Sequence, residues 1–128
     1  MKYLLDTNVI IDYLRGKKKI EAKFLEQGSA ISIITRAELY YGAYKSKAPE
    51  ENLKKIKSML QELTIETINL NENILNIYGQ LKAGLEEKGK KLDEFDLLIA
   101  ASALSDNLIL ITRNKKHFQR IPQLKLRD

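Results

Sequence analysis

Short apolar runs alternate with segments of helical spacing along this chain, and that alternation most constrains its fold. The runs are rich in β-branched residues, and turn residues bound them. Expected strands cover residues 3–5, 30–34, 65–68, 108–112 and, at a sheet edge, 124–126. Alternation of this kind predicts an α/β fold with three layers, α/β/α, around a mainly parallel sheet of four or five strands.

Glycine, proline and apolar spacing mark the expected helices. They cover residues 8–14, 20–26, 36–45, 72–88 and 93–105, and Pro49 opens another long helix. We expect one domain spanning residues 1–128, since a chain of this length with 44% hydrophobic residues can build one core.

Charge and cysteine content narrow the possible partners and compartment. The 22 Lys and Arg residues outnumber the 17 Asp and Glu residues, giving a net charge of +5, which is compatible with a polyanion partner. A solvated helix face is the alternative explanation for the lysines at 54–57. The chain has no cysteine and no apolar run approaching the roughly 20 residues of a membrane span, so we expect a cytoplasmic protein without a membrane partner.

Three acidic residues far apart in the sequence are expected at one edge of the sheet. Asp6 follows the first strand, Glu38 is expected in the first turn of the helix after the second strand, and Asp96 in the first turn of helix 93–105. Strand ends and helix starts of βαβ units share the carboxyl edge of a parallel sheet. Open α/β sheets place their sites at that edge.

Helix capping is the competing explanation for each acid. Asp6 can cap the helix that follows it, Thr35 and Glu38 match a capping box, and Asp93 can cap the helix containing Asp96. Capping does not require three helix starts to share one edge, whereas a hard divalent cation needs several converging oxygens. Together the acids predict an Mg²⁺ site with Asp6, Glu38 and Asp96 as ligands.

Four ordered sequence blocks resemble those of a known family. They are LDTNVI at 5–10, SIITRAELYYG at 32–42, FDLLIAA at 95–101 and LITRN at 110–114, with Phe118 downstream. They look like the signature blocks of PIN-domain ribonucleases, and most of all like VapC-type toxins of toxin–antitoxin pairs. The resemblance implies a parallel sheet flanked by helices, an acidic pocket binding Mg²⁺ or Mn²⁺, and single-stranded RNA as substrate.

By position, Asp6, Glu38 and Asp96 match the family's acidic pocket, and Thr7 and Thr112 match small polar residues beside it. The resemblance therefore assigns the three acids to catalysis and metal binding.

The loop after the fourth strand departs from the family pattern. Many PIN domains carry a fourth acid there, whereas this chain has Arg113 and Asn114, so a second metal lacks a charged ligand. Asp93 either compensates or caps its helix, and we favour the cap. His117 is either a loop histidine or a catalyst, and we favour the former. Arg113 is a candidate phosphate contact, with a solvated loop arginine as the alternative.

The function implied is endoribonuclease action as the toxin of a toxin–antitoxin pair, by in-line attack of metal-activated water that leaves a 5′-phosphate. Histidine-pair and cysteine chemistries are excluded, because the chain has one histidine and no cysteine. Expected partners are an RNA (tRNA, rRNA or mRNA) and a cognate small antitoxin whose C-terminal segment crosses the active-site groove. Tyr40, Tyr41 and Tyr44 either offer that segment an aromatic surface or are partly buried helix residues.

Two further expectations concern assembly and activity. A homodimer is expected through the helices at 36–45 and 49–63. The alternative function is a catalytically idle PIN module that serves as an RNA-binding or complex-forming protein, motivated by the missing fourth acid.

Overall fold

A computed structural model describes residues 1–128, and in it five strands form one parallel sheet. The strands are β1 (Tyr3–Leu5), β2 (Ser29–Ser32), β3 (Glu66–Ile68), β4 (Ile109–Ile111) and β5 (Leu126–Arg127). Their order is β3-β2-β1-β4-β5, and every neighbouring pair is parallel. The α/β fold with a parallel sheet is confirmed.

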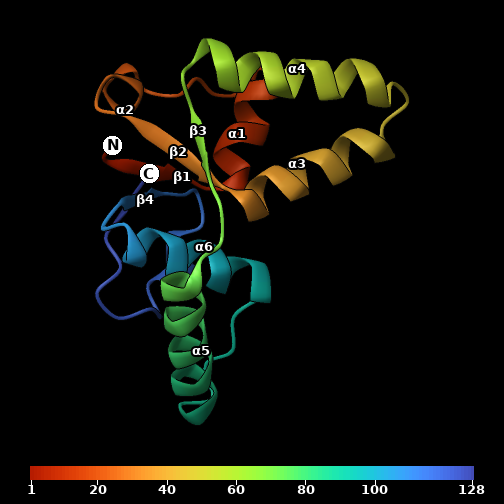
Figure 1. Ribbon diagram of the computed structural model, residues 1–128. Coiled ribbons are helices and arrows are strands. Elements are labelled where there is room, and N and C mark those ends of the chain that lie inside the picture. The colour runs from red at the N-terminus through yellow and green to blue at the C-terminus, as the bar shows by residue number, and fades with distance from the viewer.

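Seven helices cover the two faces of the sheet. They are α1 (Thr7–Leu14), α2 (Ala22–Glu26), α3 (Ile33–Lys45), α4 (Pro49–Glu62), α5 (Glu72–Glu87), α6 (Glu94–Ser105) and α7 (Lys115–Phe118). In Figure 1 the sheet separates α1 to α4 from α5 and α6, which gives the three layers expected from the sequence. None of these helices has the length and apolar character needed to cross a bilayer.

The side chains on the two faces of β1 pack into two separate hydrophobic cores. Tyr3 and Leu5 pack with residues of α1 to α4, whereas Leu4 packs with residues of α5, α6 and α7. Successive strand side chains point to opposite faces, so this three-residue strand supplies both cores. β1 lies between β2 and β4 at the centre of the sheet, and helices cover both of its faces, so all three of its residues are buried.

The second expected strand ends earlier than the sequence suggested. β2 stops at Ser32, and Ile33 already begins α3, so the expectation of a strand over 30–34 and a helix from residue 36 was wrong. Ser32 caps the helix, its hydroxyl accepting a 3.0 Å hydrogen bond from the Ile34 amide. Two isoleucines continue the apolar pattern of a strand, which concealed this cap.

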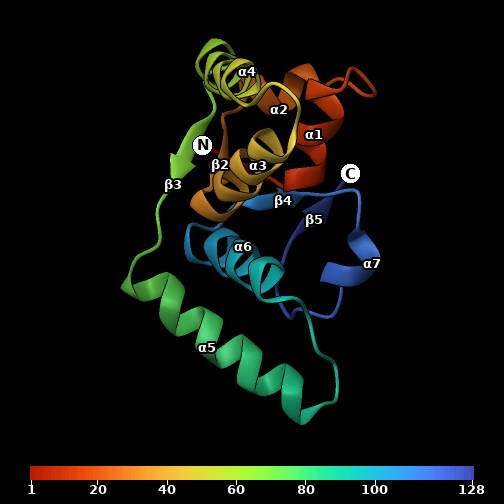
Figure 2. The ribbon, with the colours of Figure 1, turned by 90° about the vertical axis from the view of Figure 1, so that its right-hand side faces the viewer.

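Smaller differences lie at the ends of other elements. α2 begins at Ala22 rather than at residue 20, β5 covers Leu126–Arg127 rather than 124–126, and the short α7 was not expected. Because the strands are parallel, the carboxyl ends of β1, β2 and β4 share one edge of the sheet. Figure 2 shows α1 to α4 above the sheet and α5 and α6 below it.

Candidate active site

Asp6 lies at the carboxyl end of β1 and is almost fully buried, at 5% exposure. One carboxylate oxygen accepts a 2.8 Å hydrogen bond from the Thr7 amide, so Asp6 caps α1. The other accepts a 2.8 Å bond from the Thr112 hydroxyl. Burial raises the pKa of Asp6 above its usual value, while these hydrogen bonds and attraction to His117 oppose the shift. The capping explanation for Asp6 is confirmed, yet its second oxygen is held by a residue outside the helix.

Glu38 is placed differently from its expected position. α3 begins at Ile33, so Glu38 is the sixth residue of the helix and lies in the second turn rather than the first. A capping box with Thr35 was therefore a wrong explanation, because the cap is Ser32. Removal of the capping role leaves Glu38 as an acid that the helix itself does not require.

The Glu38 carboxylate is fixed by the start of α1. It accepts a 2.6 Å hydrogen bond from the Thr7 hydroxyl, which also lies 3.0 Å from the hydroxyl of the fully buried Thr35. Burial raises the pKa of Glu38, the bond from Thr7 opposes the shift, and repulsion from Asp6 and Asp93 adds to it. The role of Thr35 was missed, because a buried threonine in a helix carries no sequence signal.

Asp96 lies in the first turn of α6, as expected, and its carboxylate lies beside His117. The expectation that His117 is a loop residue was wrong, because it belongs to the short helix α7. Asp93 caps the helix through a 3.2 Å bond from the Phe95 amide, which confirms the favoured role of Asp93. Asp96 Oδ2 lies 3.3 Å from His117 Nδ1, and that same nitrogen lies 3.0 Å from Asn114 Nδ2. The nitrogen can donate to Asp96 or accept from Asn114, but it cannot do both at once.

Asp96 has the most perturbed titration of the three acids. Burial raises the pKa of Asp96 from 3.8 to about 6, repulsion from Asp6, Asp93 and Glu38 adds to the shift, and attraction to His117 opposes it. Asp6, Glu38 and Asp96 thus influence one another electrostatically, although they come from distant parts of the chain. Carboxyl groups with such shifted pKa values mark candidate functional sites.

Arg113 and Asn114 take up structural contacts in the loop after β4. Arg113 Nε donates a 2.9 Å bond to Asp12 Oδ2 on α1 in a half-buried ion pair. The Asn114 amide donates a 3.0 Å bond to the Thr112 hydroxyl. The solvated-arginine alternative is wrong for Arg113, and its role as a phosphate contact stays a prediction. Asp12, the partner of Arg113, was missed because nothing in the sequence links two residues so far apart.

The donor set of the site matches the chemistry of a hard divalent cation. No group of three acidic or histidine side chains lies close enough together to hold a metal ion by itself. Mg²⁺, however, is commonly held by one or two carboxylates and keeps several waters. Burial raises the pKa of both Asp6 and Asp96, and repulsion from neighbouring acids adds to the shift at Asp96, so a bound cation would favour the ionised forms of both carboxyl groups. Joint ligation by Asp6, Glu38 and Asp96 stays a prediction.

Known sequences related to this chain match it over almost its whole length. A model of the PIN domain family matches residues 3–124. Ribonuclease VapC2 of Haemophilus influenzae is 38% identical over 128 residues, covering 98% of this chain and 96% of that protein. The tRNA(fMet)-specific endonuclease VapC of Shigella flexneri is 35% identical over 131 residues, and the match covers 100% of this chain and 98% of that protein.

Solved structures give the same result for the backbone. The DNA-bound VapBC structure from Salmonella typhimurium matches with a TM-score of 0.92 and 34% identity, covering 100% of this chain and 98% of that chain. VapBC2 from Rickettsia felis, bound to a promoter DNA fragment, matches with a TM-score of 0.89 and 37% identity, and the match covers 99% of this chain and 98% of that chain. With the fold, the clustered acids and these full-length matches in agreement, this chain belongs to the PIN domain family.

Proposed function

We propose that this chain is an Mg²⁺- or Mn²⁺-dependent endoribonuclease and acts as the toxin of a toxin–antitoxin pair. The observation that carries the proposal is the convergence of the acids at one edge of the sheet: Thr7 binds both Asp6 and Glu38, and Asp96 is close enough to be repelled by both. Full-length relatives named ribonuclease and endonuclease VapC support RNA as the substrate. RNA cleavage needs charge stabilisation at the phosphate, which clustered acids supply only together with a cation.

Asp6, Glu38 and Asp96 would hold the cation. When bound, it lowers the pKa of a water molecule and neutralises charge on the phosphoryl oxygens. The residues around the acids keep their carboxylates in place: Thr112 and the Thr7 amide orient Asp6, and the Thr7 hydroxyl orients Glu38. Such fixed orientation of ligands commonly changes metal affinity or activity by about 10- to 100-fold.

His117 is the neighbour that Asp96 contacts in this structure. Its Nδ1 lies 3.3 Å from Asp96 Oδ2, close enough to orient that carboxylate. We place His117 as a positioning residue for Asp96, since its ring contacts that carboxylate and Asn114.

A small antitoxin protein is the proposed partner, supported by the VapBC complexes whose toxin chains this fold matches. Tyr41 and Tyr44 are 64% and 66% exposed on α3, whereas Tyr40 is half-buried and binds Arg36 through its hydroxyl. The exposed pair offers the apolar, aromatic contacts that protein interfaces favour. A homodimer through α3 and α4, and a cytoplasmic location, complete the proposal.

The second candidate is a catalytically idle module that binds RNA without cutting it. Two observations favour it: Asn114 stands where a further acid would add charge, and Asp96 is in contact with His117. Both candidates share the fold and the RNA partner. They differ only in whether the chain cleaves the RNA that it binds.

One experiment separates them. The purified chain is incubated with total RNA in Mn²⁺ or Mg²⁺, with and without EDTA, beside an Asp96→Asn variant. We expect discrete fragments with 5′-phosphate ends that disappear with EDTA and with the variant. Intact RNA under every condition, together with measurable RNA binding, would leave the idle module as the better account.

A further inference from the structure

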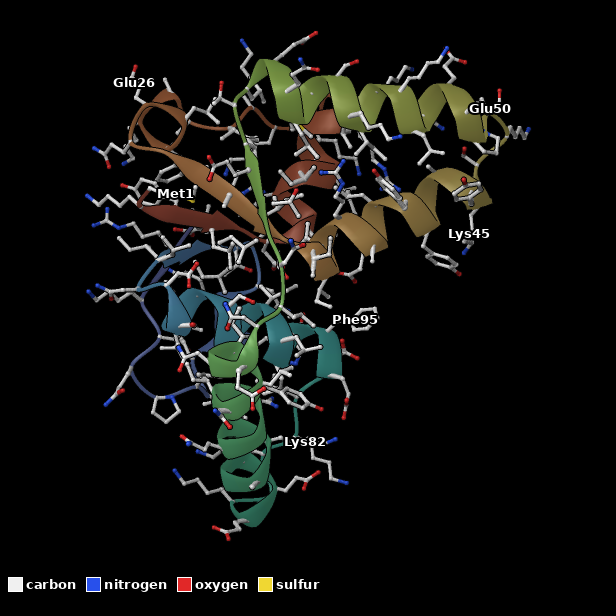
Figure 3. The ribbon with its side chains drawn as sticks, viewed as in Figure 1. Met1, Glu26, Lys45, Glu50, Lys82 and Phe95 are labelled. Carbon is white, nitrogen blue, oxygen red and sulfur yellow. The ribbon has the colours of Figure 1, made fainter.

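A groove next to Glu38 lies between α1, α3 and α4. It encloses a cavity of about 320 Å³, which is at the small end of the range for ligand pockets, about 300–1,000 Å³. Glu38 forms one wall, so the groove continues directly from the acidic side chains. Figure 1 shows α3 and α4 meeting at the loop that joins them and moving apart away from it, and Figure 3 labels Lys45 and Glu50 beside that loop.

Two cations from different helices line this groove without a carboxylate partner. Arg15 ends α1 and Lys55 lies within α4, and neither has an acidic oxygen within 4.0 Å. A helix dipole alone would favour a cation at the end of α1, but Lys55 lies in mid-helix, where that explanation fails. Glu51, one turn before Lys55, would be its natural helix partner, yet the two form no ion pair.

Gly42 leaves one wall of the groove without a side chain. It lies inside the 13-residue helix α3, where glycine costs roughly 0.5–1 kcal/mol relative to alanine. Close helix packing does not require it, because a Cβ at this position would meet nothing within 4 Å. Gly42 lines the groove, so the missing side chain widens it. Gly79 and Gly84 in α5 are equally free of such contacts, so Gly42 serves here as the place where a side chain can be introduced into the groove.

We propose that this groove is a subsite for single-stranded RNA, in which Arg15 and Lys55 bind backbone phosphates beside the cleaved one. The inference rests on the proposed ribonuclease function. Arg15 lies about 12 Å along α1 from Thr7, at 1.5 Å per residue, which is too far for the phosphate held at the acids but suitable for a neighbouring one. The apolar wall, which includes Leu39 and Ile56, lies against the nucleotide between them.

The positive charges of the groove offset the repulsion between the acidic site and RNA. Three coupled carboxylates repel an RNA strand, and a cationic groove next to them supplies the compensating attraction along the backbone. Single-strand binders combine such a cationic track with apolar contacts to the bases.

RNA binding by groove variants tests the inference. The Asp96→Asn chain, which should bind RNA without cutting it, is titrated with a fluorescent single-stranded RNA of about 10 nucleotides over a range of salt concentrations. Arg15→Gln and Lys55→Gln should each reduce the slope of log Kd against log salt by about 0.7, the value for one phosphate contact on a single strand. The matched control is Lys54→Gln, an exposed lysine of the same helix that does not line the groove, and it should leave the slope unchanged.

Filling the groove gives a second test without a charge change. Gly42→Leu should weaken RNA binding by roughly tenfold or more, because its side chain takes the space of a nucleotide. Gly79→Leu is the control, since Gly79 is also an exposed mid-helix glycine with nothing within 4 Å of an added Cβ. Circular dichroism confirms that both variants are folded.

The outcomes separate this inference from the proposed function. Equal effects of Lys54→Gln and Lys55→Gln, or full RNA affinity in Gly42→Leu, would overturn the groove while leaving the ribonuclease proposal in place. If Gly42→Leu disturbs only the binding of a protein partner, the groove belongs to that partner and the inference is wrong. If the parent chain binds no RNA at all, the proposed function fails and the groove assignment fails with it.

Discussion

The Thr112 hydroxyl donates a 2.8 Å hydrogen bond to Asp6 Oδ2, joining two buried residues that lie 106 positions apart. The sheet register explains the contact. β1 and β4 are parallel with Leu5 opposite Ile111, so the next residue of each chain segment meets the other just beyond the strands. The central pair of strands thus fixes the orientation of a carboxylate that was expected to act in the site.

Replacing Thr112 with valine should destabilise the fold and disturb Asp6. The substitution keeps the shape but removes the donor to Asp6 and the acceptor for the Asn114 amide, at a cost of about 1–3 kcal/mol. Urea denaturation measures the loss, and Thr112→Ser, which retains the hydroxyl, is the control. Equal stability of the valine and serine variants would show that the hydrogen bond contributes little.

Neutralising single acids should abolish RNA cleavage while leaving the fold intact. Asp6→Asn and Asp96→Asn remove charge without changing shape, and we expect each to lower the cleavage rate by about 100-fold or more. Glu38→Gln should behave likewise. Asparagine is a good helix cap, so a purely capping role would leave Asp6→Asn nearly as active as the parent. Cleavage by Asp96→Asn within a few-fold of the parent would contradict the assignment of the site.

The sequence was sufficient for the fold but not for all contacts within the site. Strand alternation and glycine stops reflect local physics, so the five strands and most helices could be predicted. The end of β2 was predicted wrongly at Ile33 and Ile34, because an apolar pair fits a strand and a buried first helical turn equally well. That error also placed Glu38 in the wrong turn of α3.

Contacts made by long-range packing could not be predicted at all. Thr35 and Asp12 join the site or its surroundings only because α1 packs against α3 and against the loop after β4. A sequence pattern reports which face of a helix is apolar, but not which partner it meets. Asp6 and Asp96 were placed correctly, since strand ends and helix starts in a parallel sheet share an edge whatever the details of packing.

The stability of the metal-free fold should fall as pH rises through the range in which Asp96 titrates. Its pKa is raised from 3.8 to about 6 in the folded state, so the folded chain holds a proton there that the unfolded chain has released. The contribution of Asp96 to the free energy of unfolding therefore decreases between about pH 4 and pH 6, because the folded state binds more protons than the unfolded state in this range. Melting curves in EDTA across this range measure the effect. Asp96→Asn, which cannot titrate, should lack this part of the pH dependence, and an identical pH dependence in both chains would contradict it.

Added metal should reverse this destabilisation. If Mn²⁺ or Mg²⁺ binds the folded chain only, a concentration 100-fold above the dissociation constant stabilises it by about 2.7 kcal/mol. Thermal melting in EDTA and in millimolar Mn²⁺ measures the shift at neutral pH, where the acids repel one another most. Asp6→Asn should lose most of the shift. A melting temperature indifferent to both additions would count against a metal site.

Expression in bacteria should reveal whether the chain acts as a toxin. A nuclease that cuts cellular RNA must be silenced during growth, so we expect the chain alone to slow growth and co-expression of the product of an adjacent small gene to restore it. Asp6→Asn should be harmless at the same protein level, because its fold and cap are retained while its charge is lost. Growth rate and the integrity of tRNA and rRNA are the readouts. If the parent chain accumulates freely, leaves growth unchanged and leaves RNA intact with Mg²⁺ or Mn²⁺ present, the toxin proposal fails, and an RNA-binding module without turnover becomes the better explanation of the buried acids.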